Sequence, residues 1–374
     1  MNPPQKHIEV RVSTGNFAHN IRTLRDFVAP SRLCVVMKSD AYGHGLESLL
    51  PSAIAAGADC LGICTNGEAT AIRRHQPAVP ILRLRMALAD ELEESAGGLD
   101  IEEIVGSPAA AAFLSDLGRR RGRPVDVHLK IDTGMGRTGF FVDDVASVRS
   151  ACRLDGLRIR GIMTHLPSAD AQSLVSTEAQ VARFHDLVAG LADVLPADVL
   201  VHSHNSAATA RLPGLRRDMV RVGAACYGVR TSRHFVNPPG LRTVMSIRTR
   251  VMEVREVPAG RTIGYGSLFR TARPSRIATL PVGFGEGYPR ALFNRGIVLI
   301  NGQRCPVVGR VSLNVTTVDV TDLRGEVRWG DEAVLVGRQG DEVLSFEELA
   351  DLFDGVHTEI NLMAGRFNRP YYVD

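Results

Sequence analysis

The chain has 374 residues, 44% apolar and 23% charged, which is the composition of an ordinary globular protein with room for two domains. The formal net charge is only +3, so the sequence gives no electrostatic argument for binding nucleic acid or an anionic membrane. No uncharged stretch reaches membrane-spanning length, and residues 1–7 contain no apolar leader. We therefore expect a cytoplasmic location.

The six cysteines lie in mostly apolar, strand-like runs, without the Cys-x-x-Cys or histidine spacing of a zinc site. This pattern predicts free core thiols and indicates neither a metal nor a disulfide framework. The cysteines are Cys34, Cys60, Cys64, Cys152, Cys226 and Cys305.

Residues 7–12 alternate in polarity and predict a half-exposed strand that packs with the second domain. Thereafter apolar runs alternate with alanine-rich segments of helical period. The predicted strands are residues 33–37, 59–64, 80–84, 103–106, 125–131, 159–164, 199–202 and 220–227, and the predicted helices are 46–56, 67–74, 109–120 and 178–192. Strands alternating with helices in this way predict a (β/α)8 barrel, in a domain spanning residues 1–237.

The residue pattern changes near Asn237, where short runs of alternating polar and apolar residues begin, separated by glycine and proline. They predict a mainly-β domain over residues 238–374, with a late helix at 345–352 that Ser345 and Glu348 enclose as a capping box. The strands predicted in this domain are residues 243–254, 276–280, 296–300, 307–311, 316–320 and 332–336.

The run LCVVMKSDAYGHG, residues 33–45, delivers one lysine from an apolar strand into a polar turn. Lys38 therefore follows the carboxyl end of a buried strand, where parallel α/β folds place their chemistry. Desolvation lowers the pKa of a lysine and leaves a nucleophilic amine that can form an imine. The alternative is a lysine whose stem packs on the strand end while its charge stays in water, and this stretch alone leaves both open.

Polar and glycine-containing stretches also follow later predicted strands. In KIDTGMGRTG, residues 130–139, the glycines permit close backbone approach and Arg137 can hold an oxyanion or a carboxylate. His165 follows the next strand, and HSHNSA (202–207) and VRVGA (220–224) supply small polar side chains and exposed backbone N–H groups that suit a phosphate. Each of these residues alone has a common structural explanation, whereas their occurrence at successive strand ends indicates an active site.

Taken together and in order, these stretches resemble the motifs of the alanine racemase family, over about residues 8–369. The resemblance implies pyridoxal 5'-phosphate (PLP) as cofactor, carried by Lys38 as a Schiff base, with Tyr42 bonding its phosphate. Lys130 corresponds to a lysine that is carbamylated in some members. The other implied cofactor residues are Arg137 at the phenolic oxygen and the substrate carboxylate, His165 against the pyridine ring, Arg221 at the pyridine nitrogen, and Asn205, Ser206, Gly223 and Ala224 around the phosphate.

Two of the implied residues bear on mechanism. Arg221 stays protonated, so the pyridine nitrogen would stay unprotonated and the ring would be a weaker electron sink than with an aspartate partner. In the second domain, TIGYG (262–266) resembles the Gly-Tyr-Gly motif of the family. Its Tyr265 would be the second proton-transfer residue, opposite Lys38, because racemisation needs an acid/base group on each face of Cα. In the family this tyrosine reaches the site of the other subunit, which implies a head-to-tail homodimer.

The resemblance weakens at three places. Phe284 and Glu286 stand where the family usually has tyrosine and aspartate, so a hydroxyl of the substrate entrance is missing. Leu313 and Asn314 replace Met-Asp; Leu313 can still offer its backbone N–H to the substrate carboxylate, and Asn314 adds an amide able to bond a polar substituent. Gly365 occupies the place of a bulky residue that closes the pocket, unless the register slips by one residue.

An open pocket at Gly365 predicts a substrate range beyond alanine, and substitution by tyrosine should then narrow it. The alternative is that Arg366, Phe367 or Tyr288 refills the space.

The leading hypothesis is therefore a PLP-dependent amino-acid racemase, with alanine as default substrate and serine or a bulkier amino acid as the alternative substrate. A second hypothesis keeps the cofactor and fold but performs an aldol-type reaction at Cα of a β-hydroxy amino acid. A third is a non-catalytic PLP-binding protein, against which the second domain and Tyr265 count. Decarboxylation is disfavoured because Cys305 lacks the motif that surrounds the acid of related decarboxylases.

Overall fold

The computed structural model describes residues 7–235 and 237–374 and divides the chain into two compact units. One unit comprises Phe17–Ala41 and Leu49–Leu241, and the other Met1–Asn16, Tyr42–Ser48 and Arg242–Asp374. Residues 1–6, most of the segment in which we sought a leader, lie outside the described ranges. None of the helices in those ranges combines the length and the apolar character that a membrane span requires.

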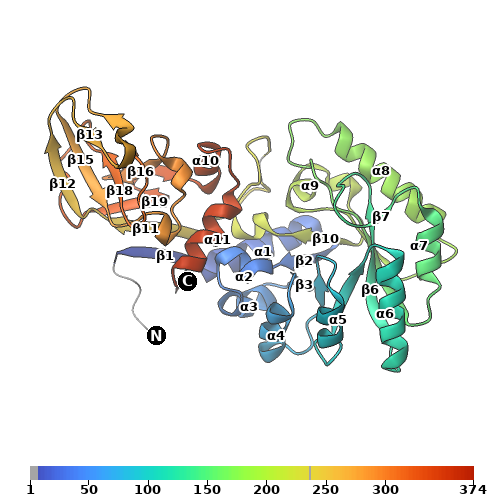
Figure 1. Cartoon of the computed structure of the whole chain (residues 1–374). Helices are drawn as coiled ribbons and strands as arrows, with labels where there is room; N and C mark the ends of the chain where they lie inside the picture. Colours follow the sequence, from blue (N-terminus) through green and yellow to red (C-terminus); the bar gives the residue numbers. More distant parts are fainter. Residues whose placement is uncertain (1–6, 236) are drawn as a thin grey trace. The chain divides into compact units, whose positions relative to one another are not determined.

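The first unit is built on a parallel sheet whose strands follow the order β10-β2-β3-β4-β5-β6-β8-β9 (Figure 1). Backbone hydrogen bonds from Asp218 to Val201 (3.1 Å) and from Arg221 to His204 (2.9 Å) bring β10 back to β9 and close the sheet into a barrel. The strands are β2 (Arg32–Val36), β3 (Cys60–Ile63), β4 (Ile81–Arg83), β5 (Ile101–Val105), β6 (Val125–Asp132), β8 (Leu157–Met163), β9 (Leu200–His202) and β10 (Met219–Val222), with the short β7 (Phe140–Phe141) beside β6.

Helices connect successive barrel strands, as parallel pairing requires. They are α2 (Lys38–Gly43), α3 (Leu46–Ala55), α4 (Asn66–His75), α5 (Ala89–Ser95), α6 (Pro108–Arg120), α7 (Val145–Cys152), α8 (Val175–Gly190) and α9 (Ser206–Arg211), while α1 (Thr14–Val28) leads from β1 of the other unit into β2. The Thr65 hydroxyl caps α4 and the Ser107 hydroxyl caps α6, each accepting the N–H of the third helical residue.

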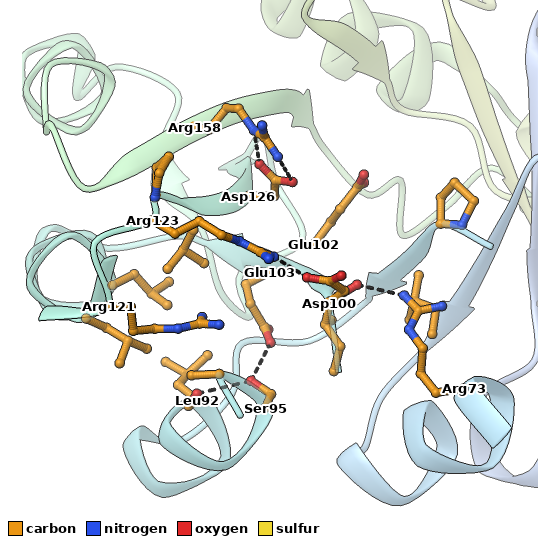
Figure 2. Close-up of a pocket in the computed structure, with 18 of the residues that line it drawn as sticks. Arg73, Leu92, Ser95, Asp100, Glu102, Glu103, Arg121, Arg123, Asp126 and Arg158 are labelled. Carbon is orange, nitrogen blue, oxygen red and sulfur yellow. Dashed lines mark hydrogen bonds and ion pairs between the residues drawn. The ribbon is translucent and has the colours of Figure 1, made fainter. Parts of the chain in front are cut away.

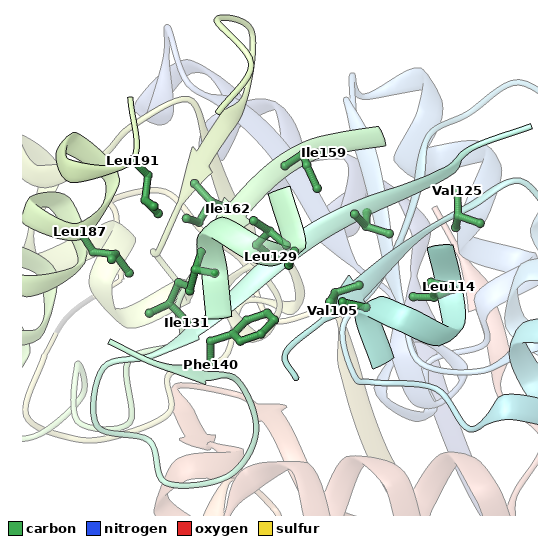
Figure 3. Packing of buried hydrophobic residues seen from close by; sticks show 14 of the residues in the cluster. Val105, Leu114, Val125, Leu129, Ile131, Phe140, Ile159, Ile162, Leu187 and Leu191 are labelled. Carbon is green, nitrogen blue, oxygen red and sulfur yellow. The ribbon is translucent and has the colours of Figure 1, made fainter. Parts of the chain in front are cut away.

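An apolar core packs β5, β6 and β8 against their helices (Figure 3). Leu129 and Ile131 on β6 and Ile162 on β8 are fully buried and meet side chains such as Leu114 of α6 and Leu187 of α8. A separate buried cluster is rich in sulfur and is made by Cys34, Cys60, Leu82, Ile104, Met163 and Met219. All six cysteines of the chain are free thiols, as predicted.

The second unit is mainly β. Its larger sheet has the order β17-β16-β19-β11-β1-β21, with β20 beside β19, and a smaller sheet has the order β12-β15-β18. The strands are β1 (Ile8–Ser13), β11 (Met245–Arg250), β12 (Glu253–Val257), β13 (Thr262–Ile263), β14 (Phe269–Arg270), β15 (Ser275–Leu280), β16 (Ile297–Ile300), β17 (Gln303–Pro306), β18 (Thr316–Asp319), β19 (Glu332–Gln339), β20 (Glu342–Leu344) and β21 (Tyr371–Val373), and the helices are α10 (Phe346–Asp351) and α11 (His357–Phe367). The predicted fold class, a (β/α)8 barrel and a mainly-β domain, is confirmed.

Three predicted strands were wrong in extent. The strand predicted at 220–227 ends at Val222, because Gly223 leaves extended geometry and a 3-10 helix (Ala224–Tyr227) follows. The run predicted at 243–254 is two strands, since the chain changes sheets at Met252, whose N–H bonds Thr279. The run predicted at 307–311 makes only a single bridge from Val307, because Gly309 turns the chain at φ 75°.

The helix predicted at 345–352 is confirmed as α10, and the Ser345 hydroxyl accepts the N–H of Glu348 at 3.1 Å. The reciprocal half of the predicted capping box was wrong, because both carboxylate oxygens of Glu348 face Arg304.

Candidate active site

Lys38 follows β2 at the carboxyl end of the barrel and begins an unusual turn. Ser39, Asp40, Ala41 and Tyr42 have φ values of 55°, 54°, 52° and 54°, so α2 is a left-handed helical turn. Left-handed geometry costs a residue other than glycine roughly 1–2 kcal/mol, and such strain clusters at functional sites. This turn could not be predicted from residue types, since none of the four residues is glycine.

Glu68 on α4 supports the turn. Its Oε1 accepts the N–H of Ser39 at 2.5 Å and that of Asp40 at 3.4 Å, while its Oε2 accepts the N–H of Cys64 at 2.8 Å. One carboxylate therefore satisfies backbone donors of two loops that follow neighbouring strands. Our sequence reasoning missed Glu68.

The loop after β6 is organised by Asp132. Its Oδ1 accepts the N–H groups of Gly134 (2.9 Å), Met135 (2.7 Å) and Gly136 (3.2 Å), and its Oδ2 accepts that of Arg137 (3.2 Å). Burial raises the pKa of this carboxyl, but the four N–H donors outweigh burial and hold the pKa below its usual value. The loop backbone is thus fixed, while the Arg137 side chain is exposed.

Lys130 lies on β6 and is 3% exposed. Its Nζ donates to the Thr138 hydroxyl at 2.6 Å. Burial, with the charges of Arg137 and Arg221, lowers the pKa of this ammonium to about 8, against the pull of Asp132. Lys130 is therefore still mostly protonated at neutral pH but gives up its proton more readily than an exposed lysine.

His165 follows β8 and is half-buried. Burial, followed by the charges of Arg221 and Arg137, lowers the pKa of its imidazole to about 3. The ring is therefore neutral at any working pH and presents an uncharged face to its surroundings.

Ser206 and the turn after β10 form a small cradle. The Ser206 hydroxyl oxygen accepts the N–H of Gly223 at 3.1 Å and that of Ala225 at 3.4 Å. Ala224, which we predicted to contact the phosphate, lies between them in the chain, whereas Ala225 was not among the predicted residues. Asn205 caps α9 by accepting the N–H of Ala208 at 3.0 Å, so it holds the cradle in place.

Arg221 on β10 is held rigidly inside the barrel. Its Nη2 donates to the carbonyls of Thr164 (2.8 Å) and Ser203 (3.2 Å), and its Nη1 bonds Nδ1 of His202 at 2.9 Å. Burial lowers the pKa of the guanidinium to about 10, so it stays charged at neutral pH. Because β10 pairs with β2 in parallel register, Arg221 opposite Cys34, the cradle and Lys38 follow adjacent strand ends.

In the β unit, Tyr265 projects from a turn between Gly264 (φ 72°) and Gly266 (φ 74°), conformations that favour glycine. The tyrosine side chain is 72% exposed. An aromatic residue so exposed on a constrained turn is available to a partner.

Two of the departures from the family pattern prove to be partners. The Asn314 amide donates to Oε1 of Glu286 at 2.6 Å, while Oε2 of Glu286 accepts the N–H of Gly283 at 2.8 Å. The carbonyl of Leu313 accepts the N–H of Gly285 at 2.7 Å, which ties the two segments together. The amide that we assigned to a polar substrate group is thus engaged within the protein.

The open space expected at Gly365 is a wrong prediction. Gly365 lies in α11, and a Cβ built on it would stand 1.8 Å from the carbonyl oxygen of Gly43. The place of the missing side chain is therefore filled by backbone, and none of the refilling side chains we considered is needed to fill it. Phe367 is in fact 51% exposed.

The barrel, the lysine after β2, the cradle beside β10 and the β unit together define the class: the chain belongs to the alanine racemase family. The family model described as alanine racemase, N-terminal domain, matches residues 12–231, and that of the C-terminal domain matches residues 244–371.

Individual members of the family are similar to this chain over most of its length. The chain is 38% identical over 362 residues to an alanine racemase of Syntrophobacter fumaroxidans, covering 96% of each protein. It is 37% identical over 376 residues to a broad specificity amino-acid racemase of Pseudomonas taetrolens, covering 98% of this chain and 90% of the relative. A crystal structure of alanine racemase from Bartonella henselae with covalently bound pyridoxal phosphate superposes with a TM-score of 0.90 at 27% identity, over 99% of this chain and 100% of that one.

Proposed function

We propose that this protein is a PLP-dependent amino-acid racemase that interconverts L- and D-amino acids. The observation that carries the proposal is the arrangement at adjacent strand ends: Lys38 follows β2, and Arg221 and Gly223 lie at the end of β10. Membership of the alanine racemase family and the PLP-containing crystal structure of a relative support the same activity.

The donor set of the barrel suits the cofactor. The Ser206 hydroxyl lies 3.1–3.4 Å from the backbone nitrogens of Gly223 and Ala225, and hydroxyl and backbone N–H groups are the kinds of group that bind phosphate. Ser206, Gly223 and Ala224 would therefore hold the phosphate, with Ala225, Asn205 and Tyr42 in support. When bound, PLP withdraws electrons from the substrate and acidifies its α-proton.

The remaining barrel residues would surround the ring. Lys38 would carry the cofactor covalently, and Arg221 would donate to the ring nitrogen while staying charged. The uncharged face of His165 suits packing against the ring. Arg137, whose side chain is exposed above a fixed loop, would bind the substrate carboxylate, together with the N–H of Leu313.

The proton moves between two bases in this proposal. The amine of Lys38 takes or gives the α-proton on one face of Cα and the phenol of Tyr265 on the other. Since Tyr265 is 72% exposed, we propose that it completes the site of a second copy in a head-to-tail homodimer. A cytoplasmic location is also part of the proposal, and fractionation of cells would test it.

We propose alanine as the default substrate and serine or a bulkier amino acid as further substrates. Phe284 in place of a tyrosine and the relationship to broad specificity racemases support the wider range. Gly365 no longer supports it, because the space beside that residue is occupied.

Chiral analysis of products tests the function. The purified protein, loaded with PLP, should convert L-alanine to a mixture of enantiomers, and kcat/KM should then be compared across alanine, serine, and longer aliphatic and basic amino acids. Release of an aldehyde from a β-hydroxy amino acid without formation of the opposite enantiomer would contradict the proposal and favour aldol chemistry. An alanine-only profile would restrict the proposal to alanine.

A further inference from the structure

A chain of hydrogen bonds runs through the barrel interior from Arg221 to Glu102. Nη1 of Arg221 lies 2.9 Å from Nδ1 of His202, Nε2 of His202 lies 2.8 Å from Nδ1 of His128, and Nε2 of His128 lies 2.8 Å from Oε2 of Glu102. Both histidines are 0% exposed. The sequence motifs pointed to neither Glu102 nor His128.

The chemistry of Arg221 fixes every proton along this chain. A guanidinium only donates, so Nδ1 of His202 must accept and the proton of this neutral ring lies on Nε2. That N–H donates to Nδ1 of His128, whose own proton must then lie on Nε2 and point at the Glu102 carboxylate. All the donors therefore point in one direction, from the cation at one end to the anion at the other.

The barrel leaves a space for this chain. Sheet order places β8 between β6, which carries His128, and β9, which carries His202, so the two rings must reach across β8. The residue of β8 in register with His128 is Gly161, and a Cβ on it would lie 2.1 Å from Nδ1 of His128. Only glycine at this position lets the two imidazoles meet.

The far end of the chain opens on a cavity of about 530 Å³. Its lining includes Ile81, Ile101, Val125 and Asp126, which lie at the amino-terminal ends of their strands, so it lies at the end of the barrel opposite Lys38. In Figure 2 the Glu102 side chain points into this cavity, among the ion pairs Arg123–Asp100 and Arg158–Asp126. The Glu102 side chain is 19% exposed, so a buried chain ends at a carboxylate in contact with water.

Other titratable groups lie near this series of hydrogen bonds without taking part in it. Cys34 is the register neighbour of Arg221, and Cys60 lies beside Cys34; a hydrogen bond in which the Cys60 thiol donates to Cys34, together with burial, raises the pKa of Cys60 well above its usual value. Lys130 feels the charge of Arg221, and Arg158 feels that of Glu102.

We infer that Glu102 and His128 are positioning residues for the proposed racemase reaction: through His202 they hold the Arg221 guanidinium in one orientation from the opposite end of the barrel. The inference rests on the proposed function, in which Arg221 faces the cofactor ring. With both Nη2 donors and one Nη1 donor engaged by Thr164, Ser203 and His202, the guanidinium plane is set before any ligand arrives. Losing the Glu102 anion frees both imidazoles to exchange tautomers, and a flipped His202 would present an N–H to Arg221 in place of an acceptor.

The test replaces Glu102 by glutamine, which keeps the shape but offers either a donor or an acceptor to His128. The nitrogen shifts of ¹⁵N-histidine in the full chain, with and without PLP, report the tautomers directly, and His128→Asn assigns the signals. We expect wild-type rings protonated only on Nε2 and mixed tautomers in Glu102→Gln. In the holoenzyme, kcat should fall on the order of 10-fold, as for other outer partners of a site residue, with KM changed much less.

Asp100→Asn is the matched control, because it removes a carboxylate from the same cavity without altering the hydrogen bonds between Glu102 and Arg221. It should leave the histidine nitrogen shifts and kcat unchanged. Gly161→Ala is a second variant: it removes no donor but displaces the His128 ring and should give the same loss of kcat. Wild-type tautomers in Glu102→Gln, or a kcat equal to that of Asp100→Asn, would overturn the inference. If the wild-type protein showed no racemase activity, only the proposed function would be contradicted, because the nitrogen shifts would still report whether Glu102 fixes the tautomers of His128 and His202.

Discussion

The site residues of the barrel and those of the β unit stand in opposite environments. Arg221 is 4% exposed and engaged by three neighbours, whereas Tyr265 is 72% and Leu313 54% exposed. The Arg221 end of the proposed site is thus held within one chain, whereas the β-unit residues of the proposal are exposed. Preorganisation on one side and exposure on the other is what a site shared between two copies requires.

The most severe way to break the barrel half is to remove Lys38. Lys38→Ala should abolish racemisation, a loss on the order of 10³-fold or more, because both the covalent link to PLP and one base disappear. Borohydride reduction of the wild-type holoenzyme should attach the cofactor to the single peptide that contains Lys38. Near wild-type turnover by Lys38→Ala without added amine would refute the proposed mechanism.

The exposed half is tested by Tyr265→Phe. Exchange of the α-proton with solvent should fall far more from one enantiomer than from the other, with a contrast on the order of 10²-fold if one acid/base group is lost. Deuterium incorporation into each enantiomer measures this contrast. Equal losses would mean that Tyr265 positions the substrate and does not transfer the proton.

Mixing the two inactive variants then sharpens the comparison. In a dimer of Lys38→Ala with Tyr265→Phe, one site receives both lesions and the other receives neither, so activity should partly return. Hybrids that form, as shown by mass spectrometry, but stay inactive would argue that each site belongs to one chain.

Not every part of the β unit is open, and Gly365 shows the difference. Gly365→Ala should lower the free energy of unfolding by about 1–3 kcal/mol, because its Cβ would meet the carbonyl oxygen of Gly43 at 1.8 Å. Gly190→Ala is the control, since no atom lies within 4 Å of the added Cβ. Thermal melts of the two variants that coincide would show that α11 adjusts, and that Gly365→Tyr could still narrow the substrate range.

The smallest effect concerns Lys130, whose pKa in the folded barrel is lowered to about 8 from 10.5. The unfolded chain binds this proton more tightly, so the free energy of unfolding should rise as the pH increases from about 8 to 10.5. Below about pH 8, Lys130 is protonated in both states, and the full cost of burying its charge is present. Between pH 7 and 9 the gain is on the order of 1 kcal/mol. Denaturant titrations of wild type and Lys130→Met should differ in this slope; equal slopes would mean that Lys130 is solvated or modified.

The barrel strands could be predicted because each is a short apolar run bounded by polar residues. The run predicted at 33–37 is β2 (Arg32–Val36), and that predicted at 125–131 is β6 (Val125–Asp132). Helices with a weak apolar stripe were missed, such as the short α9 (Ser206–Arg211) and the acidic α5 (Ala89–Ser95). The α1 helix was missed despite Phe17, Ile21, Leu24 and Val28 at helical spacing.

The candidate site divides in the same way. Lys38, Ser206 and Gly223 follow strand ends, so a barrel topology is sufficient to bring them together. Glu68, Glu102 and His128 could not be found from motifs, because their contacts depend on strand order and on the register between neighbouring strands. The left-handed turn after Lys38 is set by its surroundings against the intrinsic preference of its residues.

Gly161 ties together positions that are far apart in the chain. Because a side chain there would occupy the place of the His128 ring, the two positions cannot vary independently. A lineage that replaced Gly161 would first have to replace His128 with something smaller, and the imidazole at His202 would then lose its acceptor. In an alignment of descendants, these sites should change as a set, and a glycine far from any ligand should be among the slowest to drift.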